Sequence, residues 1–134
     1  MTISLEQLQQ DANIWLIDDD ADLLHALQQG LELEGFRVHV QSEPGDLINR
    51  LSTDSYGVIV SDIQMPTTSG MALLQAITEL DAALPTILMT GHGDVPLAVE
   101  AIQKGAYDFL EKPFPVQRLI DVINRALEKR RLVL

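Results

Sequence analysis

The chain has 134 residues, an apolar fraction of 46% and no cysteine. This length suits one domain with a real core, the lack of cysteine excludes disulfides and is compatible with a reducing cytosol, and no apolar run approaches the roughly 18 residues of a membrane span. The formal net charge of −11 argues against direct nucleic-acid binding by this segment, because phosphate backbones require lysine and arginine.

Strand and helix patterns alternate along the chain, with short connections between them. Apolar runs rich in Val and Ile indicate buried strands, and leucines three or four residues apart indicate helices. Asp20, Ser69 and Asp94 are the expected helix caps, and Pro66 is expected to prevent the third strand from continuing. In chain order we expect a flexible leader at 1–12, a strand at 13–17, a helix at 21–34, a strand at 36–40, a helix at 44–51, a strand at 58–62, a helix at 70–80, a strand at 86–90, a helix between Asp94 and Gly105, a strand at 107–110 and a helix at 115–131.

This alternation predicts an α/β fold with right-handed crossovers and one parallel sheet. The expected architecture is a (βα)5 doubly wound, five-stranded parallel sheet of the flavodoxin-like class. No linker or low-complexity stretch divides it, so we expect one folded domain over residues 13–127.

Residues with reactive or metal-binding side chains end or directly follow four of the predicted strands. Asp18 and Asp19 follow the first, Asp62 ends the third, Thr90 ends the fourth and Lys112 follows the fifth. The carboxyl ends of parallel strands share one edge of the sheet, where open α/β folds place their ligands. Three crowded carboxylates require a compensating charge, which Lys112 and a Mg²⁺ ion could supply. The cluster therefore predicts a magnesium site beside a nucleophilic Asp62 suited to phosphoryl transfer.

Each of these residues also has an ordinary structural explanation. Asp18 can be a helix cap, Asp62 a turn former, and Lys112 a surface lysine. Thr90 before Gly91 is unremarkable alone. The specific signal is that all of them fall at strand ends in sheet order.

The sequence resembles a receiver domain of two-component response regulators over about residues 13–126. The matching motifs are Leu16-Ile17-Asp18-Asp19-Asp20, Asp62-Ile63-Gln64-Met65-Pro66, Thr90-Gly91 and Lys112-Pro113-Phe114. The resemblance implies that Asp62 accepts a phosphoryl group from a sensor histidine kinase. It also implies that Asp19, Asp62 and the backbone carbonyl of Gln64 bind Mg²⁺, with Asp18 acting largely through water.

In this family Lys112 would contact the acyl phosphate and Thr90 would turn its hydroxyl towards it. The bond between Lys112 and Pro113 would be cis. The switch aromatic, often tyrosine in this family, is Phe109 here, and a phenyl ring cannot form a hydrogen bond when it points outward. Tyr107 is expected on the same strand face as Phe109.

A closer resemblance is to receivers of NtrC-type regulators of four-carbon dicarboxylate transport. It rests on Met89-Thr90-Gly91-His92-Gly93-Asp94, on Gly105-Ala106-Tyr107-Asp108-Phe109-Leu110 and on the final residues from Glu128 to Leu134. It implies a sigma-factor-dependent transcriptional activator, with residues 128–134 starting a linker helix towards an ATPase and a DNA-binding domain. The domain itself would be a phosphoprotein and not an enzyme.

The last helix has two possible apolar faces. One uses Val116, Ile120, Ile123 and Leu127 and could begin a coiled coil that makes a homodimer. The other packs Leu119, Ile123, Ala126 and Leu127 on the sheet, and we favour it for the first part of the helix. The apolar tail at Leu132 and Leu134 is expected to meet another copy.

Three other functions are open from the sequence. A haloacid-dehalogenase-like phosphatase also forms an aspartyl intermediate, but its second acid would stand at Gln64. A flavin-binding module would need a hydroxyl- and glycine-rich loop where Asp18, Asp19 and Asp20 stand. A degenerate receiver acting only as a binding module would not need Asp19, Asp62, Thr90 and Lys112 together.

Overall fold

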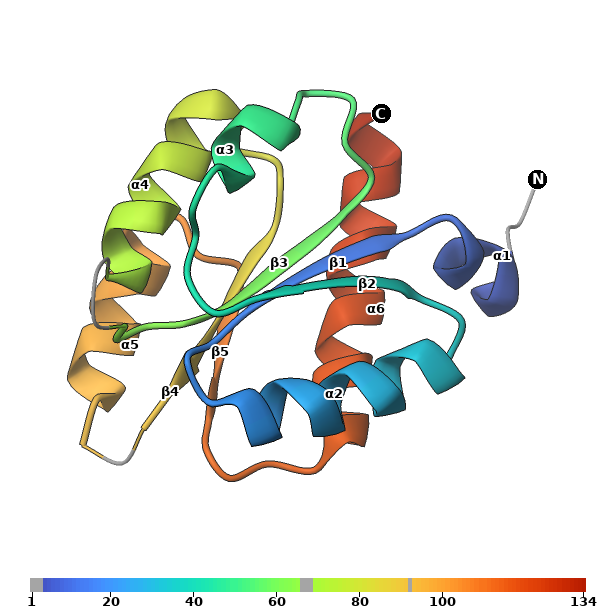
Figure 1. The fold of residues 1–134 in the computed structure, drawn as a ribbon. Coiled ribbons are helices and arrows are strands. Elements are labelled where there is room, and N and C mark those ends of the chain that lie inside the picture. The colour runs from blue at the N-terminus through green and yellow to red at the C-terminus, as the bar shows by residue number, and fades with distance from the viewer. Residues whose placement is uncertain (1–3, 66–68, 92) are drawn as a thin grey trace.

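The computed structural model describes residues 4–65, 69–91 and 93–134. Its centre is a sheet of five parallel strands in the order β2-β1-β3-β4-β5, which is the flavodoxin-like order (Figure 1). The predicted α/β architecture is therefore confirmed. The strands are β1 Asn13–Ile17, β2 Arg37–Gln41, β3 Gly57–Asp62, β4 Thr86–Thr90 and β5 Asp108–Glu111.

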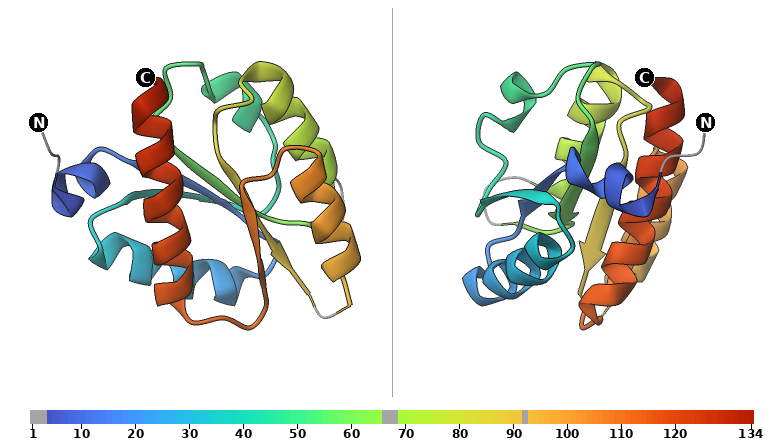
Figure 2. Two further views of the ribbon diagram at one scale, coloured as in Figure 1. Left: turned by 180° about the vertical axis from the view of Figure 1, so that it is seen from behind. Right: turned by 90° about the vertical axis from the view of Figure 1, so that its right-hand side faces the viewer.

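Helices cover both faces of this sheet (Figure 2). Buried residues of α2 and α6 pack together on one face, whereas those of α3, α4 and α5 pack on the other. Every residue of β1 after Asn13, and every residue of β3 and β4, is buried, as expected for inner strands covered on both sides. The helices are α1 Leu5–Gln10, α2 Ala21–Leu33, α3 Leu47–Arg50, α4 Gly70–Leu80, α5 Val95–Gln103 and α6 Val116–Val133.

The strand register brings the chemically active residues to one edge. Ile17, the last residue of β1, pairs with Ser61 of β3, and Asp62 pairs with Met89 of β4. Thr90 in turn pairs with Glu111 of β5. Asp18, Asp62, Thr90 and Lys112 therefore end or follow adjacent strands at the carboxyl edge. Helix α1 and the C-terminal end of α6 lie at the other end of the sheet (Figure 1).

Two of the three predicted helix caps are formed. The Asp20 carboxylate accepts a hydrogen bond from the Leu23 N–H at 3.1 Å, and the Ser69 hydroxyl accepts one from Ala72 at 3.1 Å. Asp94 stands at the N-cap position of α5, but among the described residues its carboxylate accepts a bond from the Gln64 side-chain amide at 3.2 Å and does not cap the helix. Its role as a cap was predicted wrongly.

Some boundaries also differ from the prediction. The helix expected at 44–51 is reduced to α3, because Pro44 and the left-handed Gly45, with φ +52°, form a turn before it. β2 and β5 each begin one residue later than expected, so Tyr107 precedes β5. Pro66, expected to stop β3, lies outside the described residues.

Helix α6 packs on the sheet through the face that we favoured. Leu119, Ile123, Ala126 and Leu127 are all fully buried. The apolar tail Leu132, Val133 and Leu134 is exposed, and its contact with another copy stays a prediction.

The segment predicted as a flexible leader contains a helix. In α1 the Ser4 hydroxyl and the Gln7 side chain form a capping box. The buried Gln9 amide donates hydrogen bonds to Glu34 after α2 at 3.2 Å and to Asn124 of α6 at 3.0 Å. These contacts attach the described part of the leader to the two helices on that face, because the amide bonds both.

Candidate functional site

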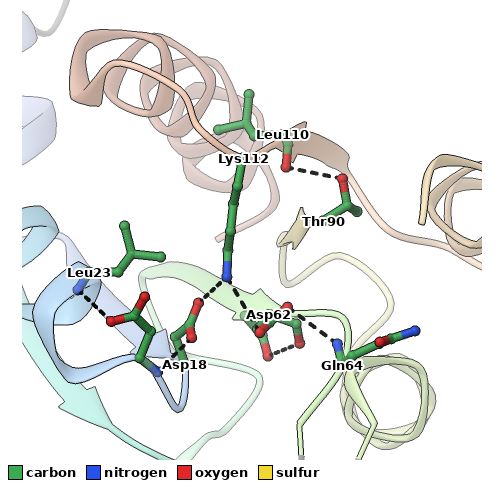
Figure 3. A network of polar contacts seen from close by, with 9 residues as sticks. Asp18, Leu23, Asp62, Gln64, Thr90, Leu110 and Lys112 are labelled. Carbon is green, nitrogen blue, oxygen red and sulfur yellow. Dashed lines mark hydrogen bonds and ion pairs between the residues drawn. The ribbon is translucent and has the colours of Figure 1, made fainter. Parts of the chain in front are cut away.

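The site is built around one lysine between two acids (Figure 3). The Lys112 ammonium lies 2.6 Å from Asp18 Oδ2 and 3.4 Å from Asp62 Oδ2. Asp18 is fully buried and Asp62 is 9% exposed. Asp18, Asp62 and Lys112 are distant in sequence, and they meet because β1, β3 and β5 end at the same edge of the sheet. The peptide bond from Lys112 to Pro113 is cis, as the resemblance implies.

Asp19 completes a cluster of three acids. Asp18, Asp19 and Asp62 each offer one carboxylate oxygen, and these atoms lie within 4.8 Å of one another. Asp18 is buried whereas Asp19 is exposed, so the cluster opens towards solvent on the Asp19 side. A group of hard oxygen donors at this spacing has the chemistry that Mg²⁺ requires.

The hydrogen bonds of Asp18 and Asp62 show which oxygens are already engaged. Asp18 Oδ1 accepts from the Asp20 N–H at 2.9 Å, and Oδ2 accepts from Lys112. Asp62 Oδ1 accepts a longer bond from the Gln64 N–H at 3.3 Å. Both oxygens of Asp18 are thus held at normal hydrogen-bond distances, whereas both contacts of Asp62 exceed 3.2 Å.

The electrostatics of the site favour protonation of Asp62 and charging of Lys112. Burial raises the pKa of Asp62, and repulsion from Asp18 adds to it, although Lys112 and the Gln64 N–H act in the opposite direction. Burial alone lowers the pKa of Lys112, but hydrogen bonds and attraction from Asp18 and Asp62 outweigh it and raise the pKa overall. Asp62 is therefore an acid whose ionised form is poorly compensated by the protein alone.

The end of β3, which carries Asp62, is also fixed by its backbone. Gly70, the first residue of α4, donates its N–H to the Ile63 carbonyl at 2.8 Å. A Cβ atom at Gly70 would lie 2.6 Å from the Asp62 carbonyl oxygen and 2.7 Å from Ile63 Cα, which no real side chain tolerates. The start of α4 is thus in close contact with the backbone of Asp62 and Ile63.

Thr90 ends β4, the strand beside β3, and Phe109 lies in the neighbouring β5 opposite Leu88. Thr90 is fully buried, and its hydroxyl donates to the Leu110 carbonyl at 3.4 Å (Figure 3). Phe109 is partly buried against the cluster that contains Leu88 and Ala98. Tyr107 packs instead with the cluster on the α2 and α6 face, so the expectation that it shares a face with Phe109 is wrong. The reason is that Tyr107 precedes β5 and does not follow its alternation.

Two contacts at the site were not predicted. The buried Ser61 hydroxyl donates to the Asp62 carbonyl at 3.0 Å. The side chain of Gln64 joins the connection after β3 to the start of α5 through Asp94. Gln64 presents a neutral amide where a dehalogenase-like phosphatase would need an acid. Neither contact has a sequence signal, because serine and glutamine are common at strand ends for other reasons.

The sequence model of the response regulator receiver domain family matches residues 14–124. Among curated proteins, the chain is similar to the C4-dicarboxylate transport transcriptional regulatory protein DctD of Rhizobium meliloti, at 52% identity over 91% of this chain. It is 55% identical to the DctD protein of Pseudomonas aeruginosa over 90% of this chain. The chain spans about a quarter, 26%, of the length of each.

Solved structures agree with this assignment. A response regulator receiver domain protein from Clostridium thermocellum superimposes with a TM-score of 0.85 at 34% identity, covering 92% of this chain and 99% of the other. The beryllofluoride-activated NtrC4 receiver domain dimer superimposes with a TM-score of 0.80 at 35% identity, covering 88% of this chain and 98% of the other. Within the described residues, the helices are too short or too polar to cross a membrane.

The fold, the acids gathered at the carboxyl edge and these similarities together show that the chain belongs to the response regulator receiver domain family.

Proposed function

We propose that Asp62 accepts a phosphoryl group from the phosphohistidine of a sensor histidine kinase. The observation that carries the proposal is the position of the Lys112 ammonium between Asp18 and Asp62, beside the exposed Asp19. In the transfer, an Asp62 carboxylate oxygen forms a bond to phosphorus as the bond from phosphorus to the histidine nitrogen breaks. Lys112 is close enough to contact the new acyl phosphate and balance its charge.

The proposed cation is Mg²⁺, held by Asp19, Asp62 and the backbone carbonyl of Gln64. The acid cluster fits it, since all its donors are hard oxygens within 4.8 Å of one another. When bound, the ion neutralises charge on the acids and on the transferred phosphoryl oxygens. Asp18 would act through water, which agrees with the engagement of both its oxygens by Asp20 and Lys112.

Thr90 and Phe109 are the proposed switch. The bond from the Thr90 hydroxyl to Leu110 is long, at 3.4 Å, so little is lost when the hydroxyl turns towards a phosphoryl group on Asp62. Phe109 then moves into the space beside Thr90. Because its ring has no hydroxyl, the outward state depends on packing alone.

The output is proposed to be a sigma-factor-dependent transcriptional activator that works as a homodimer through its last helices. Similarity to DctD proteins supports the activator, and the neighbouring NtrC4 structure is itself a receiver dimer. Exposed Leu132, Val133 and Leu134 offer apolar surface to a second copy. Residues 128–134 would belong to the helix that leads to the output domains. The acidic receiver would not touch DNA itself.

Intact mass after incubation with acetyl phosphate and Mg²⁺ tests the chemistry. The expected result is a gain of one phosphoryl group that disappears in Asp62→Asn and persists in Asp54→Asn, an exposed acid distant from the site. If the chain binds the kinase without gaining mass, it is a degenerate receiver that acts as a binding module. Light scattering with and without beryllofluoride tests the dimer, and an unchanged particle mass would count against it.

A further inference from the structure

Arg130, near the end of α6, is completely buried and has three partners. Its Nη1 donates to Asp81 Oδ2 at 2.8 Å, its Nε to the Ser55 carbonyl at 3.0 Å and its Nη2 to the Thr53 carbonyl at 2.8 Å. A guanidinium holds several acceptors in one fixed plane, unlike a flexible ammonium. The end of α6 is therefore fixed to two other parts of the molecule.

Asp81 attaches this arginine to α4. It is the residue at which α4 ends, and its Oδ1 accepts from the Ala83 N–H at 2.9 Å while Oδ2 accepts from Arg130. The Asp81 side chain is 15% exposed. This ion pair is largely shielded from water. It therefore stays formed as long as α4 and the end of α6 move together.

The opposite end of α4 touches the phosphoacceptor. Gly70 leaves no room for a side chain against the Asp62 carbonyl and Ile63, and its N–H bonds the Ile63 carbonyl. Between Gly70 and Leu80, α4 is an unbroken helix of 11 residues, which corresponds to about 16 Å of length. One rigid element thus connects the acidic site to the Asp81–Arg130 pair.

We propose that Arg130 is a positioning residue that makes the end of α6 follow α4 when Asp62 is phosphorylated, an inference that rests on the proposed function. A shift of the connection after Asp62 displaces Gly70, α4 carries the displacement to Asp81, and Arg130 carries it to the end of α6. Arg130 lies beyond residue 124, where the family match ends, whereas Asp81 lies within the matched residues.

The test separates the ion pair between Arg130 and Asp81 of α4 from the hydrogen bonds that Arg130 donates to Thr53 and Ser55. Asp81→Asn keeps an oxygen for the Ala83 N–H but turns an amide donor towards Arg130, whose bonds to Thr53 and Ser55 remain. The chain has no cysteine, so spin labels can be placed at two exposed positions, Leu33→Cys and Lys129→Cys, and labelled protein is diluted with unlabelled protein so that the distance is measured within one chain. The distance between the labels is measured by dipolar spectroscopy with Mg²⁺, with and without beryllofluoride.

We expect beryllofluoride to shift the label distance in the parent and in Glu6→Gln, an exposed acid of α1, and Asp81→Asn to lose more than half of that shift. Arg130→Lys, whose ammonium cannot hold all three acceptors, is the second variant and should behave in the same way. A full shift in both variants, or no shift in a parent that acetyl phosphate phosphorylates, would overturn the inference. Absence of phosphorylation in the parent would overturn the proposed function instead, so the two failures are distinguishable.

Discussion

Replacing Asp62, the proposed phosphoacceptor, should stabilise the fold when no metal is present. At an effective dielectric constant of about 20, two charged carboxylate oxygens at the 4.8 Å limit of the cluster repel by about 3.5 kcal/mol, and the ammonium 3.4 Å from Asp62 attracts it by about 5 kcal/mol. The repulsions from Asp18 and Asp19 therefore exceed the attraction by about 2 kcal/mol, and solvent at the exposed Asp19 reduces this to about 1 kcal/mol. Burial of Asp62 adds to the unfavourable side. Asp62→Asn should raise the free energy of unfolding by about 1–2 kcal/mol.

Urea unfolding followed by the fluorescence of Trp15, the single tryptophan, measures this change in a buffer with a chelator at pH 7. Trp15 is buried and its ring stacks on His39, so its emission should report unfolding. Asp54→Asn is the matched control and should change stability by less than about 0.5 kcal/mol. With Mg²⁺ the advantage of Asp62→Asn should shrink, because a ligand that binds the folded parent stabilises it. A lower unfolding midpoint for Asp62→Asn without metal would refute the reasoning.

The same experiment has a predicted pH dependence. Because the pKa of Asp62 is raised in the folded state, that state holds a proton that the unfolded chain has already released just above the ordinary aspartate pKa. Lowering the pH through this window should therefore stabilise the parent relative to Asp62→Asn. The difference between the two proteins should be largest at neutral pH and should diminish as Asp62 is protonated. A difference that grows on acidification would contradict the sign of the shift.

Three further substitutions test the fold. Arg130→Ala should cost about 3–5 kcal/mol in chemical unfolding, because it leaves the largely buried Asp81 carboxylate without its partner, whereas Arg125→Ala on the exposed face of α6 should cost little. Gly57→Ala places a Cβ 2.0 Å from the Asn13 carbonyl oxygen between β1 and β3, so thermal denaturation should show a loss of at least about 1–3 kcal/mol; an unchanged melting temperature would contradict this close approach. Gln9→Ala removes the bonds to Glu34 and Asn124 and should cost about 1 kcal/mol, seen as faster amide exchange in α1 with exchange in β3 unchanged.

The sequence pattern predicted the sheet because its evidence is local. Val58, Ile59 and Val60 form an apolar run that leads to Asp62, and apolar runs also lead to Asp18 after β1 and to Thr90 in β4, so the common edge of the parallel strands followed from general rules. Asp20 and Ser69 were identified as caps for the same reason, since a cap depends on the next three residues. The convergence of Asp18, Asp62 and Lys112 required only that the strands be parallel.

Contacts between distant segments could not be predicted in this way. Arg130 follows Leu127 by three residues, in line with the series that could begin a coiled coil, and only the structure brings Asp81, Thr53 and Ser55 around it. Aspartate is a residue type that often caps helices, yet the Asp94 carboxylate accepts a hydrogen bond from the Gln64 side chain of another loop. The side of β5 to which Tyr107 turns depends on a strand boundary that differs from the expected one by a single residue.

The acid cluster lies at the carboxyl ends of the strands, whereas α1 and the C-terminal end of α6 lie at the other end of the sheet (Figure 1). A new module can therefore be fused before α1 or after α6 with little interference at Asp62. Such fusions need to respect one boundary, which is the turn of α6 that contains Arg130. A junction placed before Arg130 would remove its contacts with Asp81, Thr53 and Ser55, whereas a junction placed after it would keep them.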